Sequence, residues 1–167
     1  ALYDKVLNIM LDAMETRHGV FGYMDEDGVL VCPTMTKVLD QCEMEEKCIY
    51  YAPGKWKGLW GRALKEKNTL YSNKPMAVPN GHVPIRNNLA TPILFRDKVI
   101  GLINLANKDT DYTEEDQKFL EEVSRRISPV LYAQIQKELR ERERKQGERA
   151  LEQSRREIAD ILASIQD

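Results

Sequence analysis

Glycine and proline almost vanish from the last third of the chain, and this change constrains the fold more than any other feature. Of the 9 glycines and 7 prolines, only Gly147 and Pro129 lie beyond residue 112. Frequent turn formers are typical of mixed structure, whereas a long segment without them favours helix. The sequence therefore predicts a mixed body over residues 1–112, followed by helix. Pro129 and Gly147 leave open whether that helix is continuous.

The segment 113–167 begins with a helix-start signal, because Thr113 can cap a helix and three acidic residues follow it. A single helix over this segment would be about 80 Å long at about 1.5 Å per residue. An apolar stripe that includes Leu131 runs along its first part, whereas residues 140–149 are charged on all sides. Apolar residues then recur at heptad spacing over residues 151–165. We expect this helix, Leu131 included, to pair with a second copy of itself in a homodimer.

The first 112 residues hold three shorter helical patterns. Apolar residues three and four apart begin at Leu2 and predict a helix that Gly19 ends. A threonine can cap a second helix over residues 36–47, and residues 58–67 predict a third. His18 then falls at the end of the first helix, where we expect it to have a structural role.

Apolar runs of strand length account for much of the remaining sequence before residue 112. Two of them flank the acidic turn at residues 25–28 and predict one hairpin. The runs Asn88–Phe95 and Val99–Ala106, joined by a short polar link, predict a second hairpin near the centre of a sheet. The fold class expected from these elements is α+β.

Composition excludes several classes of protein. Lys and Arg number 25 and Asp and Glu number 27, so the net charge of −2 disfavours binding to nucleic acid. The longest apolar run, residues 99–106, is far shorter than the roughly 20 residues of a membrane span, so no membrane insertion is expected. Cys32, Cys42 and Cys48 form no CxxC pair, which disfavours a disulfide scaffold or a zinc site and favours a reducing, cytoplasmic setting.

Few groups suited to catalysis are present. The chain has 2 histidines and none of the familiar nucleophile, phosphate-loop or zinc-protease motifs, so we expect no enzymatic activity from this segment. His82 lies in a loop fixed by proline and glycine, where it could bind a ligand, coordinate iron or be satisfied by backbone carbonyls. Trp56 could line a cavity for a flat ligand or fill the core, whereas Asn104 could face a pocket or satisfy a neighbouring loop.

Four segments resemble a known family in their order and spacing. They are residues 58–64 (GLWGRAL), 79–84 (PNGHVP), 91–94 (TPIL) and 99–108 (VIGLINLANK). Together they look like a GAF domain, and more closely like the GAF domains of multidomain sensory histidine kinases of prokaryotes. The resemblance covers roughly residues 1–137 and implies a central antiparallel sheet of five or six strands. It places the first and last helices on one face and a small-molecule cavity on the other.

The tail is similar to the helical linker that enters a PAS domain in such kinases. The resemblance therefore implies a sensor domain over residues 1–137 and a coiled-coil signalling helix over residues 138–167. This helix would lead to PAS and kinase domains of the same chain. The parent protein would then be a histidine kinase of a two-component system.

The resemblance also implies a ligand site. We expect its cavity to be lined by six residues: Phe21, Met35, Cys42, Trp56, His82 and Asn104. The expected ligand is a small molecule of unknown identity. One alternative is haem, with His82 or one of the cysteines as axial ligand, and another is a ligand-free scaffold that only dimerises.

A second motif of the family lies at the junction of the last strand and the long helix. The cyclic-nucleotide branch carries an Asn-Lys…Phe…Asp-Glu motif there, and Asn107, Lys108 and Asp116 match it. Tyr112 and Gln117 stand in place of the Phe and the Glu. The resemblance implies that this motif is mainly a structural lock between strand end and helix start, and it does not establish binding of a cyclic nucleotide.

Overall fold

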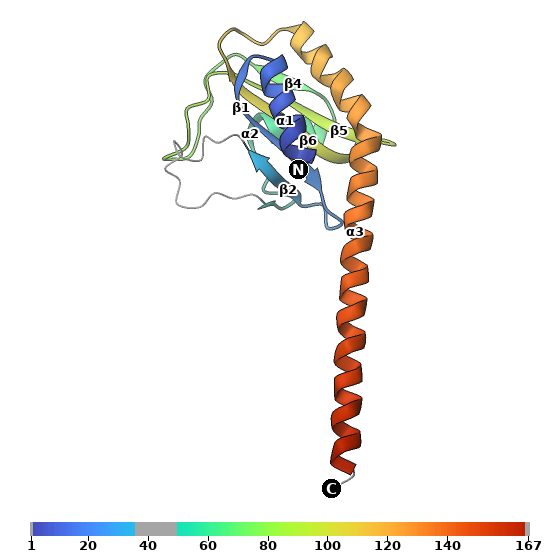
Figure 1. Ribbon diagram of the computed structural model, residues 1–167. Helices are drawn as coiled ribbons and strands as arrows, with labels where there is room; N and C mark the ends of the chain where they lie inside the picture. The colour runs from blue at the N-terminus through green and yellow to red at the C-terminus, as the bar shows by residue number, and fades with distance from the viewer. Residues whose placement is uncertain (1, 36–49, 166–167) are drawn as a thin grey trace. The chain divides into compact units, whose positions relative to one another are not determined.

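The structure of the protein is a computed structural model that describes residues 2–35 and 50–165 (Figure 1). The chain divides into two compact units, residues 1–132 and residues 133–167. In the first unit, helices cover both faces of an antiparallel sheet, which confirms the α+β class. The helix expected over residues 36–47 lies outside the described residues.

The described residues form a six-stranded sheet in the order β3-β2-β1-β6-β5-β4, with every neighbouring pair antiparallel. Both predicted hairpins are confirmed, because β1 pairs with β2 and β5 pairs with β6. The hairpins are joined where β1 pairs with β6. The strands are β1 (Thr16–Met24), β2 (Leu30–Met35), β3 (Tyr50–Tyr51), β4 (Leu70–Ser72), β5 (Asn88–Phe95) and β6 (Lys98–Lys108).

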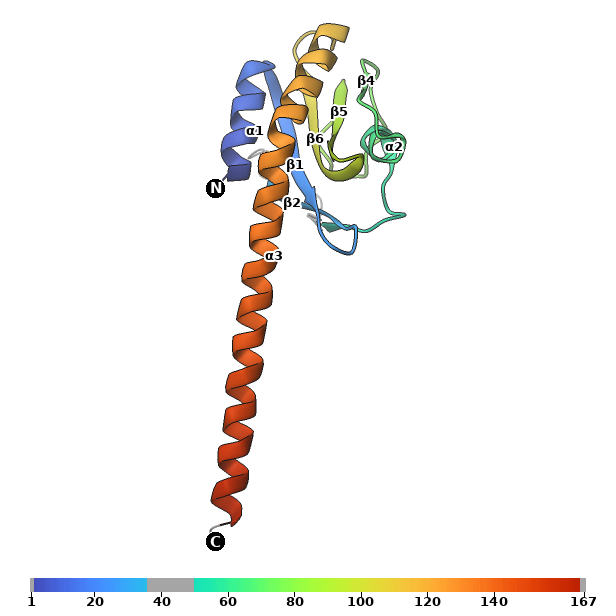
Figure 2. The ribbon, with the colours of Figure 1, turned by 90° about the vertical axis from the view of Figure 1, so that its right-hand side faces the viewer.

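Helices pack on the two faces of the sheet as the resemblance implies (Figure 2). A Cβ atom added to Gly19 of β1 would lie 2.9 Å from Leu7 of the first helix, and one added to Gly101 of β6 would lie 2.9 Å from Leu131 of the last helix. Both glycines belong to one face, so the first helix and the beginning of the last helix cover it. The second helix covers the opposite face, which we call the α2 face. The helices are α1 (Leu2–Ala13), α2 (Gly58–Glu66) and α3 (Glu114–Ile165).

The first helix ends earlier than predicted. α1 stops at Ala13, Glu15 adopts a positive φ of 50°, and β1 begins at Thr16. Gly19 therefore lies inside a strand, where it pairs with Leu105 of β6. The chain from Thr16 onward pairs with β6 instead of continuing the helix to Gly19. The missing side chain of Gly19 lets α1 approach β1 closely.

α3 is one continuous helix from Glu114 to Ile165, and it includes both Pro129 and Gly147. Its buried residues all lie before residue 132. Two of them, Ser124 and Ser128, donate hydrogen bonds to backbone carbonyls of β5, at 3.1 and 2.5 Å. These bonds hold the first turns of α3 against the sheet. No described helix is long and apolar enough to cross a membrane.

Leu131 belongs to the core of the first unit, which corrects its expected place at a dimer contact. Its side chain is 2% exposed and lies beside Gly101. The neighbouring Val130 is 57% exposed. The apolar stripe at the beginning of α3 is therefore divided, with one edge used by the fold and the other facing outward.

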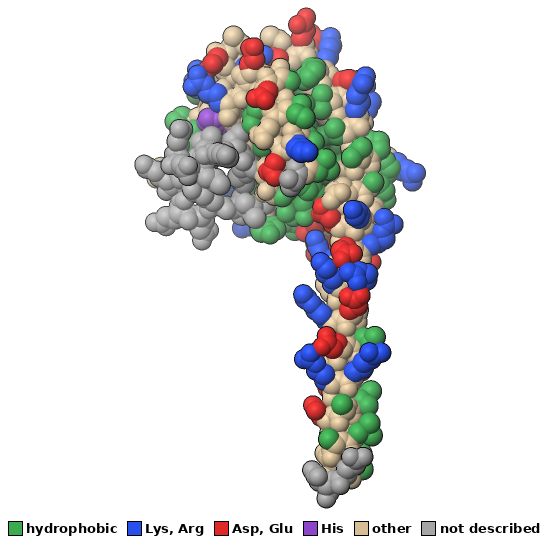
Figure 3. All heavy atoms as spheres, in the orientation of Figure 1, with side chains coloured by type: hydrophobic (Ala, Val, Ile, Leu, Met, Phe, Trp, Pro, Cys, Tyr) green, Lys and Arg blue, Asp and Glu red, His purple; other side chains and the backbone are tan. Residues whose placement is uncertain are grey.

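Every residue of α3 from 141 to 165 is exposed. Charge pairs three or four residues apart run along this part, and Arg144 pairs with Glu141 at 2.7 Å and also with Glu148. Such a pair stabilises a helix by about 0.2–0.5 kcal/mol. Five apolar side chains near the C-terminal end are 55–73% exposed (Figure 3): Leu151, Ile158, Ile161, Leu162 and Ile165.

Candidate ligand-binding site

The register of β1, β6 and β5 fixes which side chains share the α2 face. Two rows of residues cross these strands, namely His18–Ala106–Asn88 and Val20–Asn104–Ala90. Ala90 belongs to the same buried cluster as Ala63 and Leu64 of α2, which identifies the face. These two rows are the floor of the candidate site.

Aromatic side chains pack at one side of this floor. The indole Nε1 of Trp56 donates a hydrogen bond to the Tyr51 carbonyl at 3.0 Å, and the rings of Tyr51 and Trp60 meet edge to face with centroids 5.2 Å apart. Gly61 lets α2 approach Trp56, because a Cβ atom there would lie 2.6 Å from the Trp56 carbonyl carbon. Trp56 is thus held as a half-buried wall against the apolar cluster of the α2 face.

A pair of amides lies in the floor itself. The Nδ2 atom of Asn88 donates to Asn104 Oδ1 at 2.7 Å and to the Leu105 carbonyl at 2.7 Å. Asn88 is 3% exposed, and Asn104 is half-buried. A polar pair surrounded by apolar residues keeps its geometry fixed, so Asn104 presents a defined hydrogen-bonding group on this face.

His18 has an orphan nitrogen next to this pair. Its Nδ1 atom is buried and has no hydrogen-bond partner among the described residues. Burial lowers the pKa of His18 from its ordinary value of 6.5, and the positive charge of Arg17 lowers it further. His18 is therefore a neutral imidazole near pH 7.

His82 lies in the loop of residues 79–87, which we call the site loop. The His82 backbone N–H donates to the Pro79 carbonyl at 3.1 Å, and its ring Nδ1 lies 2.7 Å from the Val83 carbonyl. Because a carbonyl only accepts, Nδ1 carries a hydrogen and Nε2 is left for a ligand.

Two asparagines tie the end of the site loop to the end of β6. Asn107, at a positive φ of 63°, accepts a hydrogen bond from the Arg86 amide at 2.8 Å and donates one to the Pro84 carbonyl at 2.8 Å. Asn87 accepts from the Lys108 N–H at 2.9 Å and donates to the Lys108 carbonyl at 3.0 Å. A movement of the site loop would therefore disturb the end of β6.

Lys108 continues this network into α3. Its Nζ lies 2.7 Å from the Asp116 carboxylate, and both side chains are only 14% exposed. Burial raises the pKa of Asp116, but hydrogen bonds from Lys108 and Thr113 outweigh it and leave this pKa lowered. Tyr112, whose pKa burial raises to about 12, bonds through its hydroxyl to Thr16 at 3.0 Å. These residues join the site loop to the first turn of α3.

His82 lies in the site loop, and two of the other predicted site residues lie on the α2 face: Trp56 and Asn104. Phe21 does not, because neighbouring residues of a strand point to opposite faces. It packs under α1, with its ring centroid 5.4 Å from that of Tyr3. We therefore remove Phe21 from the candidate site.

The other predicted residues are only partly placed. The Met35 backbone pairs with Val20 at the end of β2, and Cys42 lies outside the described residues. His18 and Asn88 belong to the floor but were not predicted. Alternation along β1 places His18 on the same face as Val20 once residues 16–24 are assigned to a strand, but it does not tell which face of the sheet that is.

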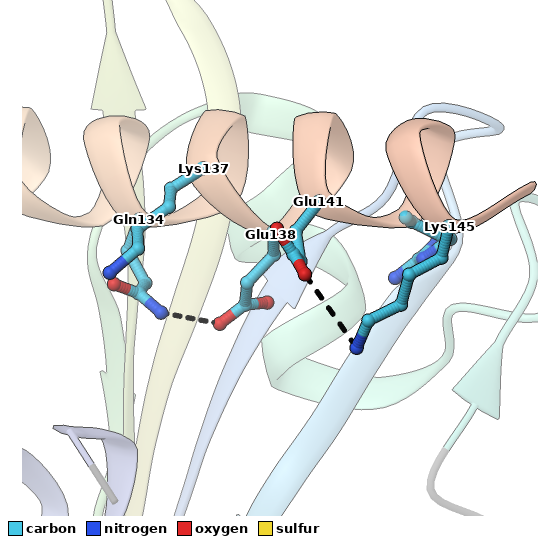
Figure 4. A pocket seen from close by; sticks show the side chains of 6 residues that line it. Gln134, Lys137, Glu138, Glu141 and Lys145 are labelled. Carbon is cyan, nitrogen blue, oxygen red and sulfur yellow. Dashed lines mark hydrogen bonds and ion pairs between the residues drawn. The ribbon is translucent and has the colours of Figure 1, made fainter. Parts of the chain in front are cut away.

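Two other kinds of site, a metal site and a groove along α3, are less favourable for binding a ligand than the α2 face. The described residues contain no group of three or more His, Cys, Asp or Glu side chains that could hold a metal ion. A groove of about 340 Å³ runs along α3, lined by Gln134, Lys137, Glu138, Glu141, Arg142 and Lys145 (Figure 4). Because all of its lining side chains come from one helix and are polar or charged, the groove does not enclose a ligand.

A curated protein resembles this chain in sequence. The methyl sulfide methyltransferase-associated sensor of Methanosarcina acetivorans is 25% identical to it over an alignment of 111 residues that covers 61% of this chain and 11% of the sensor. The chain thus corresponds to only a small part of the length of that relative.

Two solved structures resemble this chain in fold. The free methionine-R-sulfoxide reductase of Neisseria meningitidis, solved with its substrate, has a TM-score of 0.61 at 17% identity and covers 80% of this chain and 78% of its own. The GAF domain of a two-component sensor histidine kinase from Bacillus halodurans has a TM-score of 0.55 at 16% identity and covers 78% and 93%. At these identities the likeness shows the fold alone.

The family itself is shown by a wider match. The model of the GAF domain matches residues 1–131, a range that holds the α2 face, the site loop and the network that reaches α3. The GAF domain is a small-molecule sensing fold. The sequence match, the sheet order and the placement of the helices agree, and the chain belongs to the GAF domain family.

Proposed function

We propose that this chain is the sensory module of a signal-transduction histidine kinase, which binds a small molecule on the α2 face and transmits the bound state through α3. Two comparisons support the proposal, since one relative is a sensor and one structure of the same fold comes from a sensor histidine kinase. In this proposal the module is regulatory rather than catalytic, and the protein is cytoplasmic.

The observation that carries the proposal is the bonded path from the site loop to α3. Asn107 and Asn87 tie the loop to β6, and the Lys108–Asp116 ion pair ties β6 to α3. α3 then continues to Ile165 across the boundary between the two compact units. A ligand that prefers one arrangement of the site loop would favour one arrangement of the helix, and only such a difference can carry a signal.

We further propose that two copies pair in parallel through α3. The apolar residues of 151–165 are exposed and spaced in heptads, so a second copy would remove them from water. In this arrangement residues 138–167 are a dimeric linker that leads to PAS and kinase domains of the same chain.

Haem is a second candidate ligand. The Nε2 atom of His82 is left for a ligand by the bond between Nδ1 and the Val83 carbonyl. An imidazole nitrogen of this kind is a common axial ligand of haem iron.

The compound that the protein retains on purification tests the proposal. Natively purified protein would be scanned for visible absorption and then denatured, and the released small molecules would be identified by mass spectrometry. We expect one compound near one equivalent per chain, and a Soret band would identify it as haem. Release of nothing, together with no thermal stabilisation by nucleotides, haemin or small organic acids, contradicts the sensor proposal and favours a scaffold that only dimerises.

A further inference from the structure

The floor of the α2 face carries no charge. Of the six side chains in its two rows, three are the apolar Val20, Ala90 and Ala106, two are amides, and His18 is neutral near pH 7. The cations close in sequence are paired with carboxylates. Lys108 pairs with Asp116 at 2.7 Å. Arg17, which points to the other face, and Arg86 of the site loop share Asp109, at 2.6 and 3.6 Å.

This distribution disfavours a charged ligand. A carboxylate or phosphate that leaves water for a largely apolar site loses its hydration and regains that free energy only from a partner of opposite charge. Binding sites for small molecules are instead mostly apolar, with a few polar groups that fix the orientation of the ligand. The half-buried Trp56 and the amide and imidazole groups of the floor fit that description.

Some hydrogen-bonding atoms of the polar side chains in the floor also have no partner among the described residues. The buried Nδ1 of His18 has no partner among the described residues, and a buried polar atom without a hydrogen bond destabilises the empty site. Asn104 uses its oxygen to accept a bond from Asn88, which leaves its Nδ2 hydrogens to donate. A ligand that both donates and accepts would complete these bonds.

We infer that the α2-face site takes an uncharged, flat organic molecule, such as a small heterocyclic amide, that hydrogen-bonds to the His18 ring and the Asn104 amide. This inference rests on the proposed function, because it names the ligand class of the same site. In this arrangement the Trp56 ring packs against the flat face of the molecule, and His18 and Asn104 form hydrogen bonds with polar atoms at its edge.

Matched pairs of compounds test the inference on the whole chain. The probes are nicotinamide against nicotinate and uracil against orotate, followed by NMR titration of 15N-labelled protein at pH 7.5. We expect the uncharged member of at least one pair to bind at least about tenfold tighter than its carboxylate, and to shift the ring nitrogen signals of His18. His18→Phe should weaken that binding at least about tenfold, whereas His18→Asn, whose amide stands in for Nδ1, should weaken it less. Arg17→Phe is the matched control and should leave binding unchanged.

The outcomes separate this inference from the proposed function. Carboxylates that bind as tightly as their uncharged partners overturn the inference and leave the sensor proposal standing. Uncharged probes that bind without shifting the His18 ring signals, or that bind equally to both His18 variants, overturn the role of His18. If no probe binds at millimolar concentration, the inference fails, and the sensor proposal fails with it only if the purified protein also retains no compound.

Discussion

Replacing Leu131 by aspartate is expected to unfold the first compact unit rather than to separate two folded copies. Leu131 is 2% exposed and packs beside Gly101, where a carboxylate would be buried among apolar side chains. An unpaired charge in such a place costs more than about 4 kcal/mol, which is most of the stability of a domain of this size. Urea unfolding followed by circular dichroism measures the loss.

The neighbouring residue supplies the control. Val130 is 57% exposed, so Val130→Asp should change the free energy of unfolding by less than about 1 kcal/mol. A Leu131→Asp protein that stays folded but becomes monomeric would contradict the structure and place Leu131 at a dimer contact after all.

Asn87→Leu is expected to have the second largest effect, because it removes three bonds at once. The Asn87 amide donates to the Lys108 and Thr110 carbonyls at 3.0 Å each and accepts from the Lys108 N–H at 2.9 Å. The residue is 5% exposed, so water replaces these bonds poorly. We expect a loss of about 3 kcal/mol in the free energy of unfolding. Amide hydrogen exchange in the site loop and the first turn of α3 should also become faster.

Asn80→Leu is the matched control, since Asn80 is exposed in the same loop. It should leave both the stability and the exchange rates near those of the unmodified protein. Equal effects of the two substitutions would show that Asn87 does not link the site loop to α3.

Turn chemistry made the sheet predictable from the sequence. The polar link between β5 and β6 holds two consecutive residues at positive φ, Arg96 at 48° and Asp97 at 64°, as a tight hairpin requires. The acidic turn at residues 25–28 acts similarly, since Gly28 takes a φ of 75°. Both hairpins could therefore be predicted, because their turns depend on local residues.

The face of each strand residue was harder to predict. Helices cover both faces of this sheet, so both faces are apolar and alternation gives little signal. The sequence therefore predicts the wrong face for Phe21, and it predicts a helix end for His18, which lies in β1. Only the pairing of β1 with β6, a contact between distant segments, determines where these two side chains point.

The apolar stripe at the beginning of α3 is ambiguous for a related reason. Helical periodicity identifies the stripe but cannot tell which edge packs on the protein itself and which faces a partner. Leu131 and Val130 are adjacent in the sequence, yet one is buried and the other is exposed. The packing of the beginning of α3 on the sheet separates these two roles, because it covers Leu131 and leaves Val130 exposed. This packing is a contact between distant segments, so the periodicity of the helix does not contain it.

Disulfide cross-linking at residue 158 tests most directly whether two copies share α3 and whether the α2 face controls their pairing. Ile158→Cys places a thiol in the exposed stripe, and Ala163→Cys places one on the far side of the same helix. The unmodified chain reports any reaction of its own cysteines. We predict fast cross-linking of Ile158→Cys alone, at a rate that changes when the uncharged probe that binds best is added. A rate no greater than that of Ala163→Cys, or one that the bound probe leaves unchanged, would contradict the account.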